Sequence, residues 1–197
     1  MPSDQIILLM VIAASAAFTP GPNNALLASF GATVGIRKCW GHIAGIGIGF
    51  PFMIIMVGLF LGEIFQQSAV LRTGLKSVGV AILLWMAWKT ATAGRAGEEN
   101  ARRPFTFWQS AAFQWVNPKS WSFAIGVTSQ FVDPDNILVT ALYCGAAFAI
   151  VGFSSATTWA LAGQGMQRFL TNERRRRVFN GTMGALIALS AALLFVG

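Results

Sequence analysis

Two short polar stretches interrupt segments of the chain that are otherwise apolar. The first is PGPNN at positions 20–24, between IILLMVIAASAA and LLASFGA, and the second is NPK at positions 117–119, within QWVNPKSW. A proline inside a helix costs about 3 kcal/mol because it removes a backbone hydrogen bond. A lysine at the centre of a membrane helix costs roughly 2.5–3.5 kcal/mol. Residues this costly, at two separate places, favour a binding site over ordinary packing.

Both stretches are typical of a helix that stops and starts again. Pro22 suits the first turn of a new helix, and Asn117 with Pro118 suits an N-cap followed by the first helical residue. The amino end of a helix carries about half a positive charge and unpaired N–H donors. Lys119 adds a full charge beside one such end. If the two ends converge, they form a site for an anion such as a carboxylate.

The side chains of the two breaks supply the candidate ligand contacts. Asparagine amides can orient a second polar group of the ligand, and Trp115 or Trp121 either packs against the ligand or faces lipid. The alternative is that the prolines only kink the helices and that Lys119 reaches a membrane interface. The candidate binding residues are Pro20, Gly21, Pro22, Asn23, Asn24, Asn117, Pro118 and Lys119.

The composition indicates an integral membrane protein. The 197 residues are 55% hydrophobic and 11% charged, whereas a soluble domain has about 25% charged residues. The net charge of +7 would suggest nucleic acid in a soluble protein, but the basic residues lie beside apolar segments. The start, MPSDQIILLM, has no basic region typical of a cleaved signal peptide. The first apolar segment is therefore expected to remain as a membrane span.

Six segments are apolar enough over about 20 residues to cross a membrane as helices. Short polar loops separate them, which predicts an all-α polytopic fold with one transmembrane domain over 1–197. The predicted spans are 5–30, 43–63, 74–90, 107–131, 136–163 and 178–197, the first and fourth being broken.

The basic residues predict the orientation of these spans. Three loops carry most of them, and such loops usually lie in the cytoplasm. Both termini are then expected outside, with anionic lipid at the cytoplasmic face near the arginine run 174–177. The basic loop residues are Arg37, Lys38, Lys89, Arg95, Arg102, Arg103, Arg168 and Arg174 to Arg177; the opposite side has Arg72, Lys76, Asp4, Glu63, Asp133 and Asp135.

The positions of the breaks predict an inverted repeat. Each break falls in the first span of a three-span half, the halves being about 5–90 and 107–197. Because three is odd, the second half enters the membrane from the other side. In such 3+3 repeats, paired broken helices mark a substrate site near mid-membrane.

Other residues predict neither catalysis nor a metal or cofactor site. Cys39 and Cys144 have no metal-ligand spacing, and His42 has no partner for a metal or catalytic group. A small-residue face formed by Gly41, Gly45 and Gly49 packs against either a neighbouring span or a second copy in a homodimer.

The order of several short motifs resembles the lysine-exporter (LysE) family, which includes the homoserine and threonine resistance exporters. Each motif is weak alone, but together they cover nearly the whole chain. The matching elements are PGPN at 20–23; Gly35 and Arg37, followed by His42, Gly45 and Gly49; Lys76 and Gly79, followed by Leu83, Leu84, Trp88 and Lys89; and NPK at 117–119, followed by Gln130 and Phe131.

This resemblance implies a secondary transporter that exports amino acids or close derivatives across the bacterial inner membrane. It also implies that residues 20–23 and 117–119 line the translocation route. A passive small-solute channel, or another membrane protein without active transport, remains the alternative. The sequence does not identify the substrate side chain. It does not identify the coupling ion either, because the spans have no acid in their interior and His42 is only one candidate for a proton relay.

Overall fold

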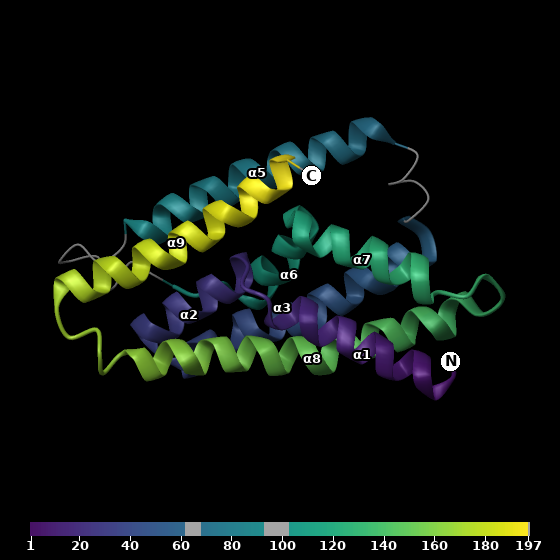
Figure 1. The fold of residues 1–197 in the computed structure, drawn as a ribbon, viewed down its shortest axis with the longest axis horizontal. Coiled ribbons are helices and arrows are strands. Elements are labelled where there is room, and N and C mark those ends of the chain that lie inside the picture. The colour runs from purple at the N-terminus through teal and green to yellow at the C-terminus, as the bar shows by residue number, and fades with distance from the viewer. Residues whose placement is uncertain (62–67, 93–102, 197) are drawn as a thin grey trace.

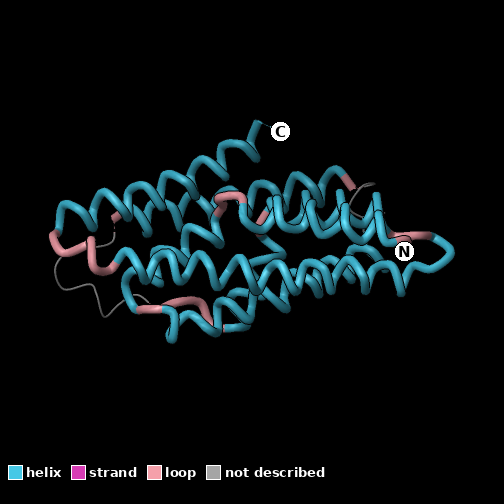
Figure 2. The backbone as a smooth tube through the Cα atoms, turned by 60° about the horizontal axis from the view of Figure 1, so that its bottom comes forward, coloured by secondary structure: helices cyan, strands magenta, loops and turns pink. Residues whose placement is uncertain are grey.

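The computed structural model describes residues 1–61, 68–92 and 103–196, which form an entirely helical bundle (Figure 1). Figure 2 shows the same part of the chain as a tube, with helix along almost all of its length. Its α-helices are α1 (Ser3–Phe18), α2 (Pro22–Val34), α3 (Ile36–Met56), α5 (Ala69–Ala91), α6 (Phe107–Val116), α7 (Pro118–Phe131), α8 (Ile137–Met166) and α9 (Glu173–Val196). A π-helical turn, η1 (Val57–Leu61), continues α3, and a 3-10 turn, η3 (Pro134–Asn136), precedes α8.

The helix bounds follow the predicted spans closely at the two breaks. The predicted span 107–131 corresponds to α6 and α7 together, interrupted at Asn117 as expected. The first predicted span corresponds to α1 and α2 but continues to Val34. The second begins at Ile36 rather than at residue 43, so the basic residues expected in a loop lie in the first turn of α3.

Some of the helices are long and apolar enough to cross a membrane. Among the described residues, two stretches are long and apolar enough to cross a membrane, Ile36–Phe60 and Pro134–Met166. The pair α1 and α2 makes a third if it is one span, bent by 55° at its break. An all-helical membrane fold is thus supported, while the six-span 3+3 arrangement stays a prediction.

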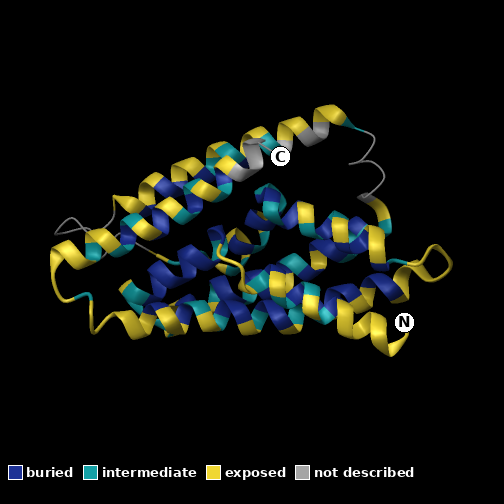
Figure 3. Cartoon of the chain, in the orientation of Figure 1, coloured by how far each residue is buried: buried dark blue, intermediate teal, exposed yellow. Residues whose placement is uncertain are grey.

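Two apolar cores hold the helices together, and α8 contributes to both. The first core combines residues mainly of α2, α3, α5 and α9 with Phe113 of α6. The second combines residues of α1, α7 and the later part of α3. Both breaks therefore lie where the chain passes from one core to the other. Figure 3 shows the buried residues on the inner faces of the helices, and apolar side chains such as Trp40 and Trp108 remain exposed on the outer faces.

The small-residue face of α3 packs against α6 of the same chain. A Cβ added at Gly45 would lie 2.4 Å from the Cβ of Ser110, and one at Gly49 would lie 2.6 Å from the Cα of Ala111. The neighbouring-span alternative is therefore correct for this face. The homodimer stays a prediction that needs another surface.

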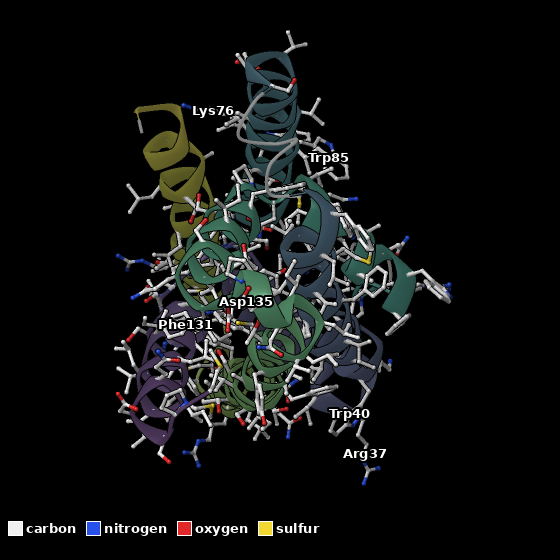
Figure 4. All side chains as sticks on the ribbon, turned by 90° about the vertical axis from the view of Figure 1, so that its right-hand side faces the viewer. Arg37, Trp40, Lys76, Trp85, Phe131 and Asp135 are labelled. Atoms are coloured by element: carbon white, nitrogen blue, oxygen red, sulfur yellow. The ribbon has the colours of Figure 1, made fainter. Side chains whose placement is uncertain are left out.

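The basic residues that were used to predict orientation gather at helix ends. Arg37 and Lys38 begin α3, Lys89 lies near the end of α5, and the arginine run begins α9. These ends lie on the same side of the bundle in Figure 1. Arg37 and Trp40 project outward in Figure 4, which looks along the bundle. The predicted residues Glu63, Arg95 and Arg102 lie outside the described residues.

Candidate functional site

The first break lies between α1 and α2 and extends over residues 19–21. α1 ends at Phe18, Gly21 is fully extended with φ −169° and ψ −178°, and Pro22 opens α2. Proline is favourable there because the first helical N–H has no partner inside the helix. The prediction that a second helix begins at Pro22 is confirmed.

Side chains from α2, α7 and α8 satisfy the carbonyls that this break exposes. Asn24 donates from Nδ2 to the carbonyl oxygens of Ala17 (2.8 Å) and Thr19 (3.0 Å). Ser155 of α8 also donates to Ala17 O (2.6 Å), and the amine of Lys119 donates to Thr19 O (2.9 Å). Backbone that leaves a helix at membrane depth needs such partners, and here each of the two carbonyls has two.

The second break is a single residue, Asn117, between α6 and α7. Its Oδ1 accepts from the N–H of Lys119 (3.1 Å), as an N-cap does, and its own N–H donates to Gln114 O (3.3 Å). Pro118 is the first residue of α7. The predicted cap and helix start are both confirmed, and all of these contacts are local in sequence.

The two breaks meet inside the protein. Asn23 of α2 donates to Oε1 of Gln114 of α6 at 3.0 Å. The side chain of Lys119 lies against the first break, because a Cβ added at Gly21 would be 3.0 Å from its Nζ. The amine also lies 5.9 Å from the ring centre of Phe123. The two helix starts converge, as predicted, and the amine of Lys119 reaches from the start of α7 to the backbone just before α2.

A cavity of about 60 Å³ lies at this meeting point. This is well above the roughly 10–15 Å³ that a cavity needs to hold one water, so there is room for more than one water or for a small polar molecule. The residues that line it are Ala16, Ala17, Gly21, Pro22, Asn23, Asn24, Ile46, Phe50, Gln114, Asn117, Lys119, Ser120, Phe123, Phe148, Gly152, Ser155 and Ala156.

Six of the eight predicted binding residues line this cavity, and two do not. Pro20 is exposed at the turn of the first break. Pro118 packs instead against α5, where a Cβ added at Gly79 would lie 2.7 Å from its Cγ. Both prolines end or begin helices, so their contribution is to backbone geometry.

The aromatic walls differ from the two tryptophans considered from sequence. Neither Trp115 nor Trp121 lines the cavity; Nε1 of Trp121 donates to the carbonyl of Trp115 at 2.8 Å, which ties α7 to α6. The cavity rings are Phe50, Phe123 and Phe148. Three polar residues of the cavity were not predicted from the sequence: Gln114, Ser120 and Ser155. A polar residue within an apolar span is a signal for them, since such residues usually face a cavity or a partner.

His42 and the cysteines are separate from the cavity. His42 is fully buried, its ring 5.1 Å from that of Phe105 and 5.9 Å from that of Phe30, and neither ring nitrogen has a partner among the described residues. Cys39 and Cys144 are buried free thiols. Within the described ranges, no three His, Cys, Asp or Glu side chains come together as metal ligands would.

The site therefore offers positive polarity, neutral amides and aromatic walls. One amine and two helix starts can hold an anionic group, while asparagine and glutamine amides can bind neutral or cationic polar groups. Broken helices that meet at a cavity between apolar helices, with polar side chains in part of its wall, are typical of membrane transport proteins. That is the class of protein which the fold and the site define.

Comparison with known proteins gives the family. The chain belongs to the LysE type translocator family, whose sequence model matches residues 14–197. It is 34% identical over 182 residues to the cysteine/O-acetylserine efflux protein of Salmonella choleraesuis (strain SC-B67), covering 91% of both chains. It is 30% identical over 181 residues to the protein of that name from Escherichia coli (strain K12), again covering 91% of both. No solved structure matches the chain.

Proposed function

We propose that this protein is a secondary transporter that exports small amino acids from the cytoplasm across the bacterial inner membrane. Two relatives named as cysteine/O-acetylserine efflux proteins match nearly its whole length, and those two compounds are the first substrates to test. The cavity supports the same conclusion, because its size and mixed polarity suit a small zwitterion.

The observation that carries the proposal is the position of Lys119. Its amine lies in the cavity wall at the start of α7 and contacts the backbone just before α2 begins. A substrate carboxylate there would meet one full charge and the positive ends of two helices. The rings of Phe50, Phe123 and Phe148 would contact the rest of the molecule.

The proposed topology has six spans in two inverted halves of three, with both termini outside the cytoplasm. The supports are the order of the helices, the two breaks in corresponding spans and the basic residues at one end of the bundle. Transport would be driven by the proton or electrical gradient of the membrane. The basic loops would lie at the cytoplasmic face beside anionic lipid.

The competing function is a passive channel for small solutes. A transporter with alternating access shows saturable counterflow of labelled substrate in vesicles, whereas a channel shows flux that rises linearly with concentration. Catalysis receives no support from the cavity: the described residues that line it include a lysine, amides and two hydroxyls but no carboxylate, cysteine or histidine.

The decisive variant is Lys119→Met, which keeps the length of the side chain and removes its charge. Thr19 O would still accept from Asn24, so the variant is expected to fold. We expect export of cysteine and O-acetylserine to fall about ten- to a hundredfold, the usual effect of losing a hydrogen bond to a charged group. The measurement is intracellular accumulation of each amino acid in cells with and without the protein.

Lys38→Met is the matched control, since Lys38 is exposed at the start of α3 and does not line the cavity. It should export like the unmodified protein. Normal export by a membrane-inserted Lys119→Met variant would show that the amine does not bind substrate. If the unmodified protein changed the accumulation of no amino acid, the proposed function itself would be wrong.

A further inference from the structure

Gln114 is a glutamine with almost no solvent exposure, 1%, inside a predicted membrane span. It lies on α6 just before the second break and lines the cavity. Its amide makes three contacts: Nε2 donates to the carbonyl of Ser110 (2.8 Å), and Oε1 accepts from the hydroxyl of Ser120 (3.0 Å) and from Nδ2 of Asn23 (3.0 Å). An amide held by three hydrogen bonds must have a defined orientation.

The Ser110 carbonyl determines which way the Gln114 amide faces. A carbonyl oxygen can only accept, so it must meet the nitrogen of Gln114 and not the oxygen. The oxygen then faces Asn23, and an oxygen there can only accept as well. Asn23 must therefore present its nitrogen to Gln114, which turns its own oxygen, Oδ1, the other way. One backbone carbonyl thus orients two amides in succession.

The Asn23 oxygen that results is an acceptor without a donor. Oδ1 of Asn23 is enclosed by protein and has no hydrogen-bond partner among the described residues. Asn23 as a residue is half-buried and lines the same cavity as Lys119, so a small rotation of its side chain would bring Oδ1 to a ligand there. Buried acceptors are nearly always paired, so one that stays unpaired beside a cavity is suited to a ligand that donates. An α-ammonium group is such a donor, and a carboxylate is not.

We propose that Gln114 is a positioning residue that makes Asn23 Oδ1 the acceptor for the α-ammonium group of the substrate. This inference rests on the proposed function, in which Lys119 and the two helix starts hold the carboxylate. The site then requires both charges of a zwitterion. Amino acids with a free amino group are substrates, and the same molecules with a blocked amino group are not.

Two isomers test this requirement directly. O-acetylserine has a free ammonium group and N-acetylserine does not, although the two have the same atoms and the same carboxylate. Inside-out membrane vesicles from cells that express the full chain would be loaded with each compound, and counterflow would be measured. The buffer should be mildly acidic, because a protonated amino group of O-acetylserine cannot accept the acetyl group from oxygen. We expect the unmodified protein to prefer O-acetylserine by at least about tenfold.

Three variants separate the roles of the residues. Gln114→Leu frees the Asn23 amide to turn, and Asn23→Leu removes the acceptor; both should reduce the preference to about onefold to threefold. Ser120→Ala is the matched control, because it removes a hydrogen bond from the same Gln114 oxygen while Ser110 still sets the orientation. It should keep the preference. The ratio of the two substrates within one sample is independent of expression level.

The measured preferences distinguish failure of the ammonium site from failure of the proposed function. If the unmodified protein transports both isomers equally, there is no ammonium site, although the proposed export stands. If the Gln114→Leu variant keeps the full preference, Gln114 does not orient Asn23. If the Gln114→Leu variant does not insert into the membrane, the Gln114→Met variant is used in its place. The Asn23→Leu variant tests the acceptor independently. If the unmodified protein transports neither isomer nor any other amino acid, the proposed function fails instead.

Discussion

The two breaks look alike in sequence, but the structure stabilises them differently. The first opens three residues of backbone and depends on Asn24, on Ser155 from α8 and on Lys119 from α7. The second opens one residue, and Asn117 caps it with contacts to its own neighbours. Local sequence therefore determines the second break, whereas the first also needs side chains from α7 and α8. The first break is the one whose geometry other helices can change.

The same contrast continues in the helices that follow. α2, after the first break, approaches α8 so closely that a Cβ added at Gly31 would lie 2.1 Å from the carbonyl oxygen of Ala160. A Cβ added at Gly163 of α8 would similarly lie 2.0 Å from Ala28 O. In α7, after the second break, Gly126 has open space around its Cβ position. Tight backbone packing thus fixes the later part of α2 against α8, and the start of α7 has its own cap.

The largest effect is expected from Gly31→Ala. The new methyl group would meet backbone that cannot move aside, so we expect a loss of about 3 kcal/mol or more and little folded protein. Gly126→Ala is the matched substitution in α7, and it should stabilise by about 0.5–1 kcal/mol because alanine favours helix. Thermal unfolding in detergent would measure both. Equal effects would contradict the difference in packing between α2 and α7.

A second, smaller effect concerns the carbonyl of Ala17, which accepts from both Asn24 and Ser155. Either Asn24→Leu or Ser155→Ala leaves one donor and should cost about 1 kcal/mol. Together they leave the carbonyl without a side-chain donor, so the double variant should lose about 1–3 kcal/mol more than the sum. Thermal unfolding of the single and double variants gives this coupling.

Simple addition of the two losses would mean that water in the cavity replaces the side chains. The first break would then resemble the second, because its stability would depend little on hydrogen bonds from other helices. The corresponding test at the second break needs no distant partner, because the oxygen of Asn117 and the N–H that it accepts from lie two residues apart.

These differences explain how much could be predicted from the sequence. The cap at Asn117, the start at Pro118 and the end of α7 near residue 131 follow from local rules, and they were predicted correctly. The meeting of the breaks was also predicted, from the pairing of two costly interruptions. Gln114 was not, since its contact is with Asn23, 91 positions away. Ser155 is a polar residue in an unbroken apolar helix, which suggests a buried contact but not that its partner is the first break.

Two neighbouring asparagines show most clearly what could not be predicted from the sequence. Asn23 and Asn24 were predicted to have the same role, but Asn24 donates to the backbone of the first break while Asn23 donates to Gln114. On a helix, adjacent residues point about 100° apart. Both line the cavity, and which contact each of them makes depends on how α2 is rotated, which its packing on α8 sets.

The smallest expected effect tests how closely Lys119 is held against the first break. Gly21 is extended, a conformation that alanine also adopts, but its Cβ would lie 3.0 Å from Lys119 Nζ and 3.2 Å from Cδ. We expect Gly21→Ala to leave stability unchanged and to displace the flexible amine slightly. The apparent affinity for exported amino acid should fall about threefold, because a charged hydrogen bond weakens when its length and angle change.

Counterflow at several substrate concentrations would measure this affinity, with Gly165→Ala, which has open space at its Cβ position, as the control. The effect should depend on the amine itself. In a Lys119→Met background, Gly21→Ala should therefore change affinity no further, because there is no charged group left to displace. A threefold loss that persisted in that background would show that the methyl group acts on the cavity directly, and that the first break does not position the lysine.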